Sequence, residues 1–255
     1  MNALIDTHAH LDEYDDIVPV MEGARNAGLT AVIAVGLDIP TNGRTLEIAG
    51  LYPGFVYPAI GWYPANLDIA AVDENLRYLE ANIVSAAAVG EIGLDYLKRV
   101  RDRVPKEFQQ EILTALLSLA RRHGKPALLH TRYAWKDALK IAVDAGLEKA
   151  VFHSFTGPSK ILKAVLEAGY YVSVTPAVAY NPEMQRVVWE TPLDNLMLET
   201  DCPIVFKSHR TGEEPSAVPA DVLKTLRGAA ELKGISEEAL AAATTANARR
   251  LFGIG

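Results

Sequence analysis

Eight short apolar runs, each bounded by turn-forming residues, alternate along the chain with longer amphipathic segments. The runs, which read as strands, are residues 3–8, 29–36, 55–62, 86–94, 126–131, 149–155, 170–176 and 195–201. Helical spacing of apolar residues marks segments such as 18–28, 72–82, 106–124, 135–146 and 159–169. Repeated βα units predict a parallel sheet, and eight of them in 255 residues fit a TIM (β/α)8 barrel of the α/β class. We therefore predict a single barrel domain over residues 1–255.

The last part of the chain predicts two further helices, over residues 221–234 and 236–253. In the second, Ser236 is a suitable N-cap and is followed by two acidic residues in the first turn. Arg249 and Arg250 precede Gly253, which is the charge order that the helix dipole favours. The longest irregular stretches, residues 95–105 and 202–218, both follow strands. In a barrel such loops form the catalytic face.

Titratable side chains recur where the predicted strands end. His8 and His10 stand one residue apart in IDTHAHLD, so strand alternation points both to the same side. The fourth, fifth, sixth and eighth strands supply the other members of a set of six: His8, His10, Glu91, His130, His153 and Asp201. All six are expected at the carboxyl ends of strands, and a barrel would gather them at one mouth. His123, at a helix end, and His209, in a loop, fall outside the pattern.

This set has the donor chemistry of a metal centre. The single cysteine, Cys202, excludes both an internal disulfide and a cysteine-rich zinc site. Imidazole and carboxylate together suit divalent transition metals, and two ions would need a bridge, for which Glu91 is the natural candidate. Asp201 would then bind one ion and take the proton of an attacking water. Taken singly, each residue has an ordinary structural explanation, such as a salt bridge for Glu91 or an N-cap for Asp201.

Charge and hydropathy limit the partners. A net charge of −7 argues against non-specific coating of nucleic acid, although the basic runs 98–103 and 207–210 leave room for local contacts. The chain has no apolar run near the roughly 18 residues of a membrane span, and its start does not resemble a signal peptide. We expect a cytoplasmic protein without a membrane or an obligate protein partner.

Five strings in order, IDTHAHLD, VGEIGLDY, LLHTR, FHSFTG and LMLETDCP, resemble the TatD family of metal-dependent hydrolases, as does the closing TTANARRLFG. The resemblance implies a TIM barrel with two divalent metal ions that hydrolyses phosphodiesters as a deoxyribonuclease or exonuclease. By this resemblance, one ion is bound by His8, His10, Glu91 and Asp201, and the other lies among Glu91, His130 and His153. Arg132, in HTR, would clamp a substrate phosphate, with a surface salt bridge as the alternative.

Two departures from the family pattern concern substrate contacts. The usual Gly-x-His-Pro-His string reads AIGWYPAN here, so that Tyr63 and Ala65 replace two histidines. If this region contacts substrate, as we expect for Tyr63, nuclease activity is weakened or redirected. The family's Asn-Glu-Pro reads Glu213-Glu214-Pro215, which adds a negative charge near the expected mouth.

Three functions remain open from the sequence. The leading one is a phosphodiesterase that acts on DNA ends or single strands, with the basic run 98–103 as an anionic track and Trp62 either stacking a base or packing in the barrel. The second is a hydrolase of a small ester, lactone, amide or phosphoester on the same scaffold. The third is a non-catalytic barrel that keeps a metal as a structural element. The complete set of six expected ligands argues against this third function.

Overall fold

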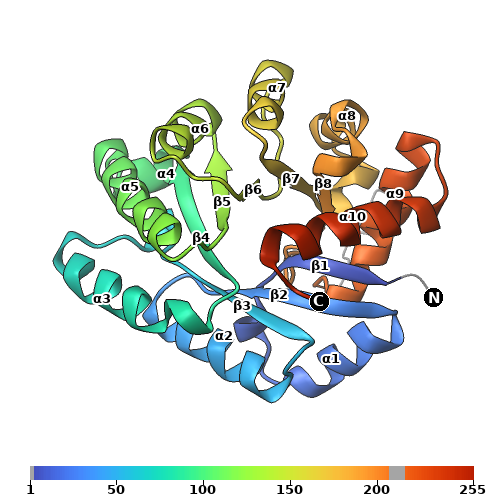
Figure 1. Ribbon diagram of the computed structural model, residues 1–255, viewed down its shortest axis with the longest axis horizontal. Coiled ribbons are helices and arrows are strands. Elements are labelled where there is room, and N and C mark those ends of the chain that lie inside the picture. Colours follow the sequence, from blue (N-terminus) through green and yellow to red (C-terminus); the bar gives the residue numbers. More distant parts are fainter. Residues whose placement is uncertain (1–2, 207–215) are drawn as a thin grey trace.

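The computed structural model describes residues 3–206 and 216–255. Its eight strands form one parallel sheet in sequential order, which confirms the predicted barrel (Figure 1). The strands are β1 (Leu4–Ala9), β2 (Leu29–Val35), β3 (Val56–Ile60), β4 (Ala88–Asp95), β5 (Ala127–Arg132), β6 (Ala150–Phe152), β7 (Tyr171–Val174) and β8 (Leu196–Leu198). The basic run 207–210 and the segment 213–215 lie outside the described residues.

The first and last strands meet through a seam of hydrogen bonds just beyond β8. The amide of Asp201 donates to the carbonyl of His8 at 2.9 Å, and that of His10 donates to the carbonyl of Cys202 at 2.9 Å. Below them the buried carboxylate of Asp6 accepts bonds from the amide (2.9 Å) and the hydroxyl (2.6 Å) of Thr200. The seam therefore fixes the first and last strands against each other where His8, His10 and Asp201 approach the mouth.

Ten helices in the described part of the chain surround the strands (Figure 1). They are α1 (Ile17–Asn26), α2 (Ile39–Leu51), α3 (Val72–Asn82), α4 (Lys98–Arg101), α5 (Lys106–Arg122), α6 (Trp135–Asp144), α7 (Ser159–Glu167), α8 (Pro182–Glu190), α9 (Val222–Lys233) and α10 (Glu237–Phe252). The seven helices expected from periodicity are confirmed within a few residues at their ends. None of the ten is long and apolar enough to cross a bilayer.

Local chemistry explains where several helices begin and end. In α10 the Ser236 hydroxyl accepts a bond from the Ala239 amide, and Gly253 ends the helix in the left-handed conformation, both as expected. The sequence did not reveal α2, whose helical pattern contains Gly43 and Gly50 and which starts at the capping residue Asp38. The irregular stretch expected at 95–105 was partly wrong, since α4 occupies its centre.

The barrel interior is closed at the end opposite the mouth. Inward side chains of seven strands form one buried cluster with the end of α10: Ile5, Ala31, Ile33, Val35, Ala59, Ala88, Leu128, Val151, Met197, Ala248, Leu251, Phe252 and Ile254. Helix α10 crosses this end of the barrel, and its Asn247 amide donates to the carbonyls of Leu193 and Leu196 at the start of β8. The six titratable residues predicted from the sequence therefore lie toward the other end of the barrel.

Candidate metal centre

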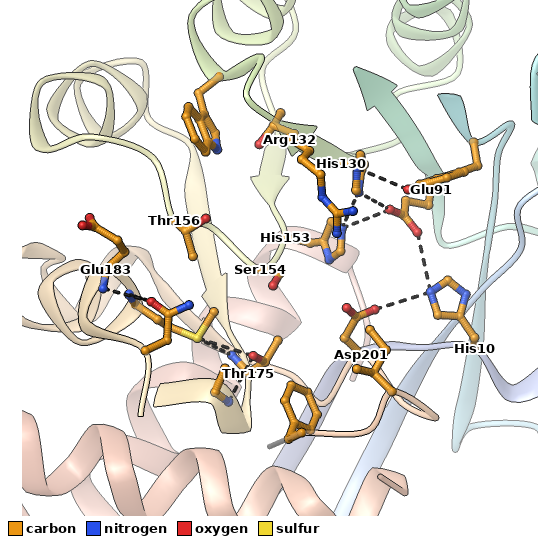
Figure 2. A pocket seen from close by; sticks show the side chains of 18 of the residues that line it. His10, Glu91, His130, Arg132, His153, Ser154, Thr156, Thr175, Glu183 and Asp201 are labelled. Atoms are coloured by element: carbon orange, nitrogen blue, oxygen red, sulfur yellow. Dashed lines mark hydrogen bonds and ion pairs between the residues drawn. The ribbon is translucent and has the colours of Figure 1, made fainter. Parts of the chain in front are cut away.

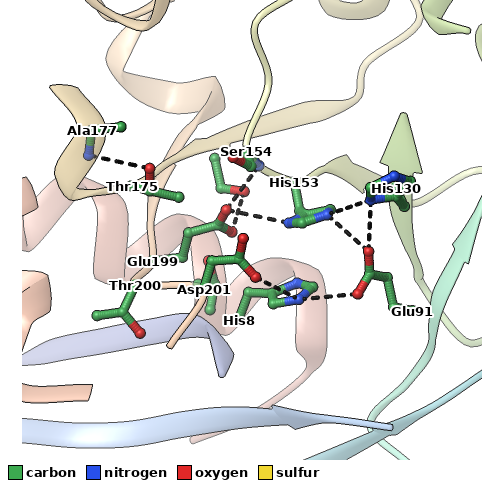
Figure 3. Close-up of polar contacts among 12 residues, drawn as sticks. His8, Glu91, His130, His153, Ser154, Thr175, Ala177, Glu199, Thr200 and Asp201 are labelled. Carbon is green, nitrogen blue, oxygen red and sulfur yellow. Dashed lines mark hydrogen bonds and ion pairs between the residues drawn. The ribbon is translucent and has the colours of Figure 1, made fainter. Parts of the chain in front are cut away.

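The Glu91 carboxylate faces four histidines, of which His8, His130 and His153 are labelled in Figure 3. One oxygen, Oε1, is 2.8 Å from His130 Nδ1 and 3.0 Å from His153 Nε2. The other, Oε2, is 3.4 Å from His8 Nε2 and 3.6 Å from His10 Nε2. Each carboxylate oxygen therefore faces its own pair of imidazoles. We expected Glu91 at the carboxyl end of its strand, but it lies halfway along β4, because β4 continues beside β5 as far as Asp95.

Asp201 completes the pair formed by His8 and His10. Its Oδ1 is 3.5 Å from the Nε2 atom of each of these histidines, which are themselves 3.2 Å apart. The barrel seam places Asp201 there, with a backbone φ of 55° that non-glycine residues rarely adopt. The structure thus brings together all six residues that the sequence singled out, while their role as ligands stays a prediction.

Five of the six residues are buried, Asp201 is half-buried, and the set fits divalent metal ions. Three sets of three offer ligand atoms within 4.8 Å of one another: His8, His153 and Asp201; His8, His10 and Glu91; and Glu91, His130 and His153. The donors are imidazole nitrogens and carboxylate oxygens, which suit zinc, manganese, iron and related ions. The Nδ1 atoms of His8 and His10 have no hydrogen-bond partner in the described residues, and their Nε2 atoms point into the cluster.

Electrostatics within the cluster favour a bound cation. Burial alone would raise the pKa of Glu91, but the surrounding histidines, above all His153, hold it well below its usual value. Burial lowers the pKa of His10, yet Asp201 and Glu91 outweigh it and raise this pKa to about 9. Without a metal, buried carboxylates therefore hold protons on neighbouring imidazoles. A divalent ion would replace those protons.

A second carboxylate lies behind His130. The Nδ1 atom of His130 faces Glu91, while its Nε2 atom is 3.5 Å from Asp95 Oδ2 and 3.4 Å from the hydroxyl of Tyr63. Asp95 is held in turn by the amide of Leu97, which donates to its Oδ1 at 2.8 Å. Such outer carboxylates orient a metal-binding histidine and make it more basic.

Glu199 occupies the corresponding place behind His153. Its Oε1 is 3.5 Å from His153 Nδ1 and accepts a bond from the Ser154 amide at 2.8 Å, while Oε2 accepts one from the Ser173 hydroxyl (Figure 3). Neither Asp95 nor Glu199 was expected at the site from the sequence. Their positions could have indicated them, because each is an acidic residue near the end of a predicted strand that also carries a predicted ligand.

A pocket of about 650 Å³ opens over the cluster. Figure 2 shows His10, Glu91 and His130 on one side of it, and Thr156, Thr175 and Glu183 on the other. The two predicted substrate contacts, Arg132 and Tyr63, both line this pocket, whereas Ala65 does not. In the described part of the chain, every non-glycine residue with a positive φ also lines it: Tyr133, Ser154 and Asp201. Such backbone strain concentrates at functional sites.

Of the two alternatives for Trp62, packing in the barrel is confirmed. Trp62 is only 2% exposed, and its Nε1 donates to the carbonyl of Asn66 at 3.1 Å, so it packs in the barrel and is unable to stack a base. The basic run 98–103 does not line the pocket. It forms α4 and the turn after it, where Lys98 pairs with Asp102 at 2.6 Å.

Comparison with known proteins gives concordant similarities. The family model described as TatD related DNase matches residues 5–253. The uncharacterized metal-dependent hydrolase YabD of Bacillus subtilis is 34% identical over 260 residues, which cover 98% of this chain and 99% of that protein. Human deoxyribonuclease TATDN3 is 29% identical over 264 residues, 98% and 94% of the two chains. The crystal structure of YJJV, a TatD homologue of Escherichia coli, superposes with a TM-score of 0.86 at 26% identity, covering 99% of this chain and 98% of that one.

Proposed function

Since this chain belongs to the TatD family of metal-dependent hydrolases, we propose that it hydrolyses phosphodiester bonds at the ends of DNA strands. The name of human TATDN3, deoxyribonuclease, supports this substrate class for a relative of similar length. The geometry of the site supports the reaction type.

The observation that carries the proposal is the division of the Glu91 carboxylate between two pairs of histidines. Oε2 faces His8 and His10, and Oε1 faces His130 and His153. A carboxylate in this position is suited to bridge two ions about 3.5–4 Å apart. Asp201 would join the first pair as a ligand. Two bound ions would lower the pKa of a water molecule and polarise the phosphate oxygens.

The protein's own side chains supply the remaining functions. Asp201 is 13% exposed at its side chain and lines the pocket, so it can accept a proton from a water molecule that attacks from the open side. Arg132, an exposed residue at the pocket wall, can donate two parallel hydrogen bonds to a phosphate. The Tyr63 hydroxyl stays protonated, because burial and the nearby Glu91 raise its pKa, and it can donate a third.

The charges that line the pocket favour a strand end over the middle of a strand. Among the described lining residues, Arg132 is the only lysine or arginine, while Glu13 and Glu183 add negative charge. A long polyanion normally follows a track of several cationic side chains. One guanidinium and two metal ions are enough for one phosphodiester. We therefore assign the pocket to a terminal nucleotide.

The test is nucleotide release from single-stranded DNA labelled at either end. Chelator-treated protein would be assayed with magnesium, manganese, cobalt or zinc, beside Asp201→Asn, His8→Ala and the control His123→Ala. His123 pairs with Glu80 at the end of α5, away from the pocket, so its loss should leave activity intact. We expect metal-dependent release that both site variants abolish.

The amount of bound metal separates the remaining outcomes. If calorimetry shows about two ions per chain but no metal supports release, DNA is the wrong substrate. The alternative hydrolysis of small esters, lactones, amides or phosphoesters would then be assayed. If the protein and His8→Ala bind no metal at all, the assignment of the cluster itself is refuted.

A further inference from the structure

The pocket extends well beyond the six clustered residues. Its far part, which we call the side lobe, is formed by the end of β5 and the segments that follow β5, β6 and β7, and its walls include Thr131, Tyr133, Trp135, Thr156, Asn181 and Met184. Figure 2 shows Thr156 across the pocket from Glu91. The proposed hydrolysis gives this space no role, although it adjoins the place where a phosphate would bind.

Two side chains of the side lobe carry buried polar atoms without partners. Thr131 is 9% exposed, and neither its Oγ1 nor Trp135 Nε1 has a hydrogen-bond partner within residues 3–206 and 216–255. Native proteins pair nearly all buried donors, with protein, water or ligand atoms. The indole N–H can only donate, so it requires an acceptor. The side lobe thus offers a hydrogen bond that the folded chain leaves unused.

The same lobe presents an aromatic pair. Tyr133 is 65% exposed, and its ring lies edge-on to that of Trp135, with centroids 6.0 Å apart and an interplanar angle of 72°. Tyr133 has a φ of 57°, a conformation that turns the chain sharply between β5 and α6. Gly157 packs closely against Trp135, since an added methyl group there would lie 3.0 Å from the indole Cγ. One ring therefore packs against the neighbouring chain and the other is open to solvent.

Charge defines what this lobe can accept. Arg132 lies between His130 and the aromatic pair in sequence and is the only described lysine or arginine that lines the pocket. On the far side the charged lining residue is Glu183 (Figure 2). A second phosphate would meet a carboxylate there, whereas an uncharged ring would meet aromatic, threonine and methionine side chains.

We propose that the side lobe is a specificity site for an aromatic group joined to the scissile phosphate, which in a DNA strand is the terminal base. Tyr133 stacks on the ring, and Trp135 Nε1 donates to an acceptor on its edge. The proposal rests on the proposed function for the identity of the ring, but not for the existence of the site. Stacking of a base on an aromatic side chain is largely independent of sequence, so all four bases should be accepted.

The experiment compares two ligands that differ only in the base. Calorimetry would measure binding of dAMP and of 2-deoxyribose 5-phosphate to manganese-loaded protein. We expect dAMP to bind more tightly, and Tyr133→Leu to weaken dAMP at least about fivefold while leaving the sugar phosphate unchanged. Tyr133→Phe keeps the ring and should restore dAMP binding. Trp135→Phe, which removes only the N–H donor and part of the ring, should weaken dAMP alone.

A matched control and a second ligand pair make the test decisive. Trp189 on α8 is 70% exposed and does not line the pocket, so Trp189→Phe should change neither affinity. Equal affinities of the wild-type protein for dAMP and the sugar phosphate, or equal losses in Tyr133→Leu, would overturn the proposal for the base. If DNA is not cleaved, 4-nitrophenyl phosphate and methyl phosphate replace the two ligands. A preference for the aryl ester that Tyr133→Leu removes would uphold the aromatic site while the nuclease function fails, and no preference would overturn both.

Discussion

Glu199→Gln tests whether the outer carboxylates hold the centre together. The Glu199 side chain is fully buried and accepts hydrogen bonds from the Ser154 amide and the Ser173 hydroxyl. Glutamine has nearly the same shape but keeps only one acceptor oxygen. Its NH₂ group must therefore face the Ser154 N–H, where two donors would meet, or the Ser173 hydroxyl, which would have to accept instead of donate. The substitution also removes the charge that lies 3.5 Å from His153 Nδ1.

The size of the effect follows from these contacts. A hydrogen bond to a charged group contributes about 1.5–3 kcal/mol. Loss of one of the two bonds and weakening of the other should therefore lower the free energy of unfolding by about 2–4 kcal/mol. For a chain of 255 residues this corresponds to a fall in Tm of roughly 4–8 °C. Because His153 would lose its orienting partner, metal affinity should fall about 10- to 100-fold.

Thermal unfolding of metal-free protein and calorimetric titration with manganese would measure the two effects. Glu167→Gln is the matched control, because Glu167 is an exposed residue of α7 that pairs only loosely with Lys163, at 3.7 Å. If Glu199→Gln behaves like this control in both measurements, Glu199 does not position His153, and the reasoning fails.

Three further perturbations address charge, packing and backbone space. Metal-free protein should lose stability as the pH rises from about 6.5 to about 9. Asp201 and Glu91 overcome the effect of burial and raise the His10 pKa to about 9. The protonated imidazole therefore stabilises the fold fully below its ordinary pKa, and this contribution of about 3 kcal/mol is lost as the pH rises through about 9. Urea unfolding at pH 6, 7.5 and 9 measures it, and a flat profile would contradict it. Asn42→Ala should lower the free energy of unfolding by about 2–4 kcal/mol in the same assay, since the Asn42 amide bonds both the N–H (3.0 Å) and the carbonyl (2.7 Å) of buried Gly61; a loss below about 0.5 kcal/mol would show that these bonds are dispensable. Gly93→Ala should prevent β4 from pairing with β5, because its Cβ would lie 2.0 Å from the carbonyl oxygen of His130 at a φ of 150°; native-like circular dichroism and metal binding would refute this.

The fold was predictable because its signal is repeated. Each strand run is short, apolar and followed by a helical pattern, so an error in one unit leaves the barrel evident. The helices that escaped notice have local reasons. The two glycines of α2 dilute its helical pattern, and α4 is a single turn in a charged segment. Periodicity carries no information about such segments.

Prediction of the site succeeded where side-chain direction follows from strand alternation. His8 and His10 share a side because one residue separates them in a strand, and parallel strands bring His130 and His153 to the same mouth. It stayed undecided where position depends on loops. For Trp62 both stacking and packing were open, and the structure shows its indole donating inward to the carbonyl of Asn66. The exposure of Tyr133 likewise depends on a left-handed turn that no spacing rule anticipates.

The seam between β1 and β8 has a consequence for the order in which the protein is made. Asp6 and Thr200, which it joins, are 194 residues apart, and the flanking residues His8, His10 and Asp201 are parts of the same centre. During synthesis the two histidines leave the ribosome first, and the Asp201 carboxylate opposite them leaves only after all eight strands have been made. A nascent chain therefore cannot form the complete centre, and an ion bound early by the histidines alone would have one side open to exchange. With the proposed ligand set, full metal loading would follow closure of the barrel, and we expect a chain interrupted before β8 to lack metal-dependent activity as well as a finished fold.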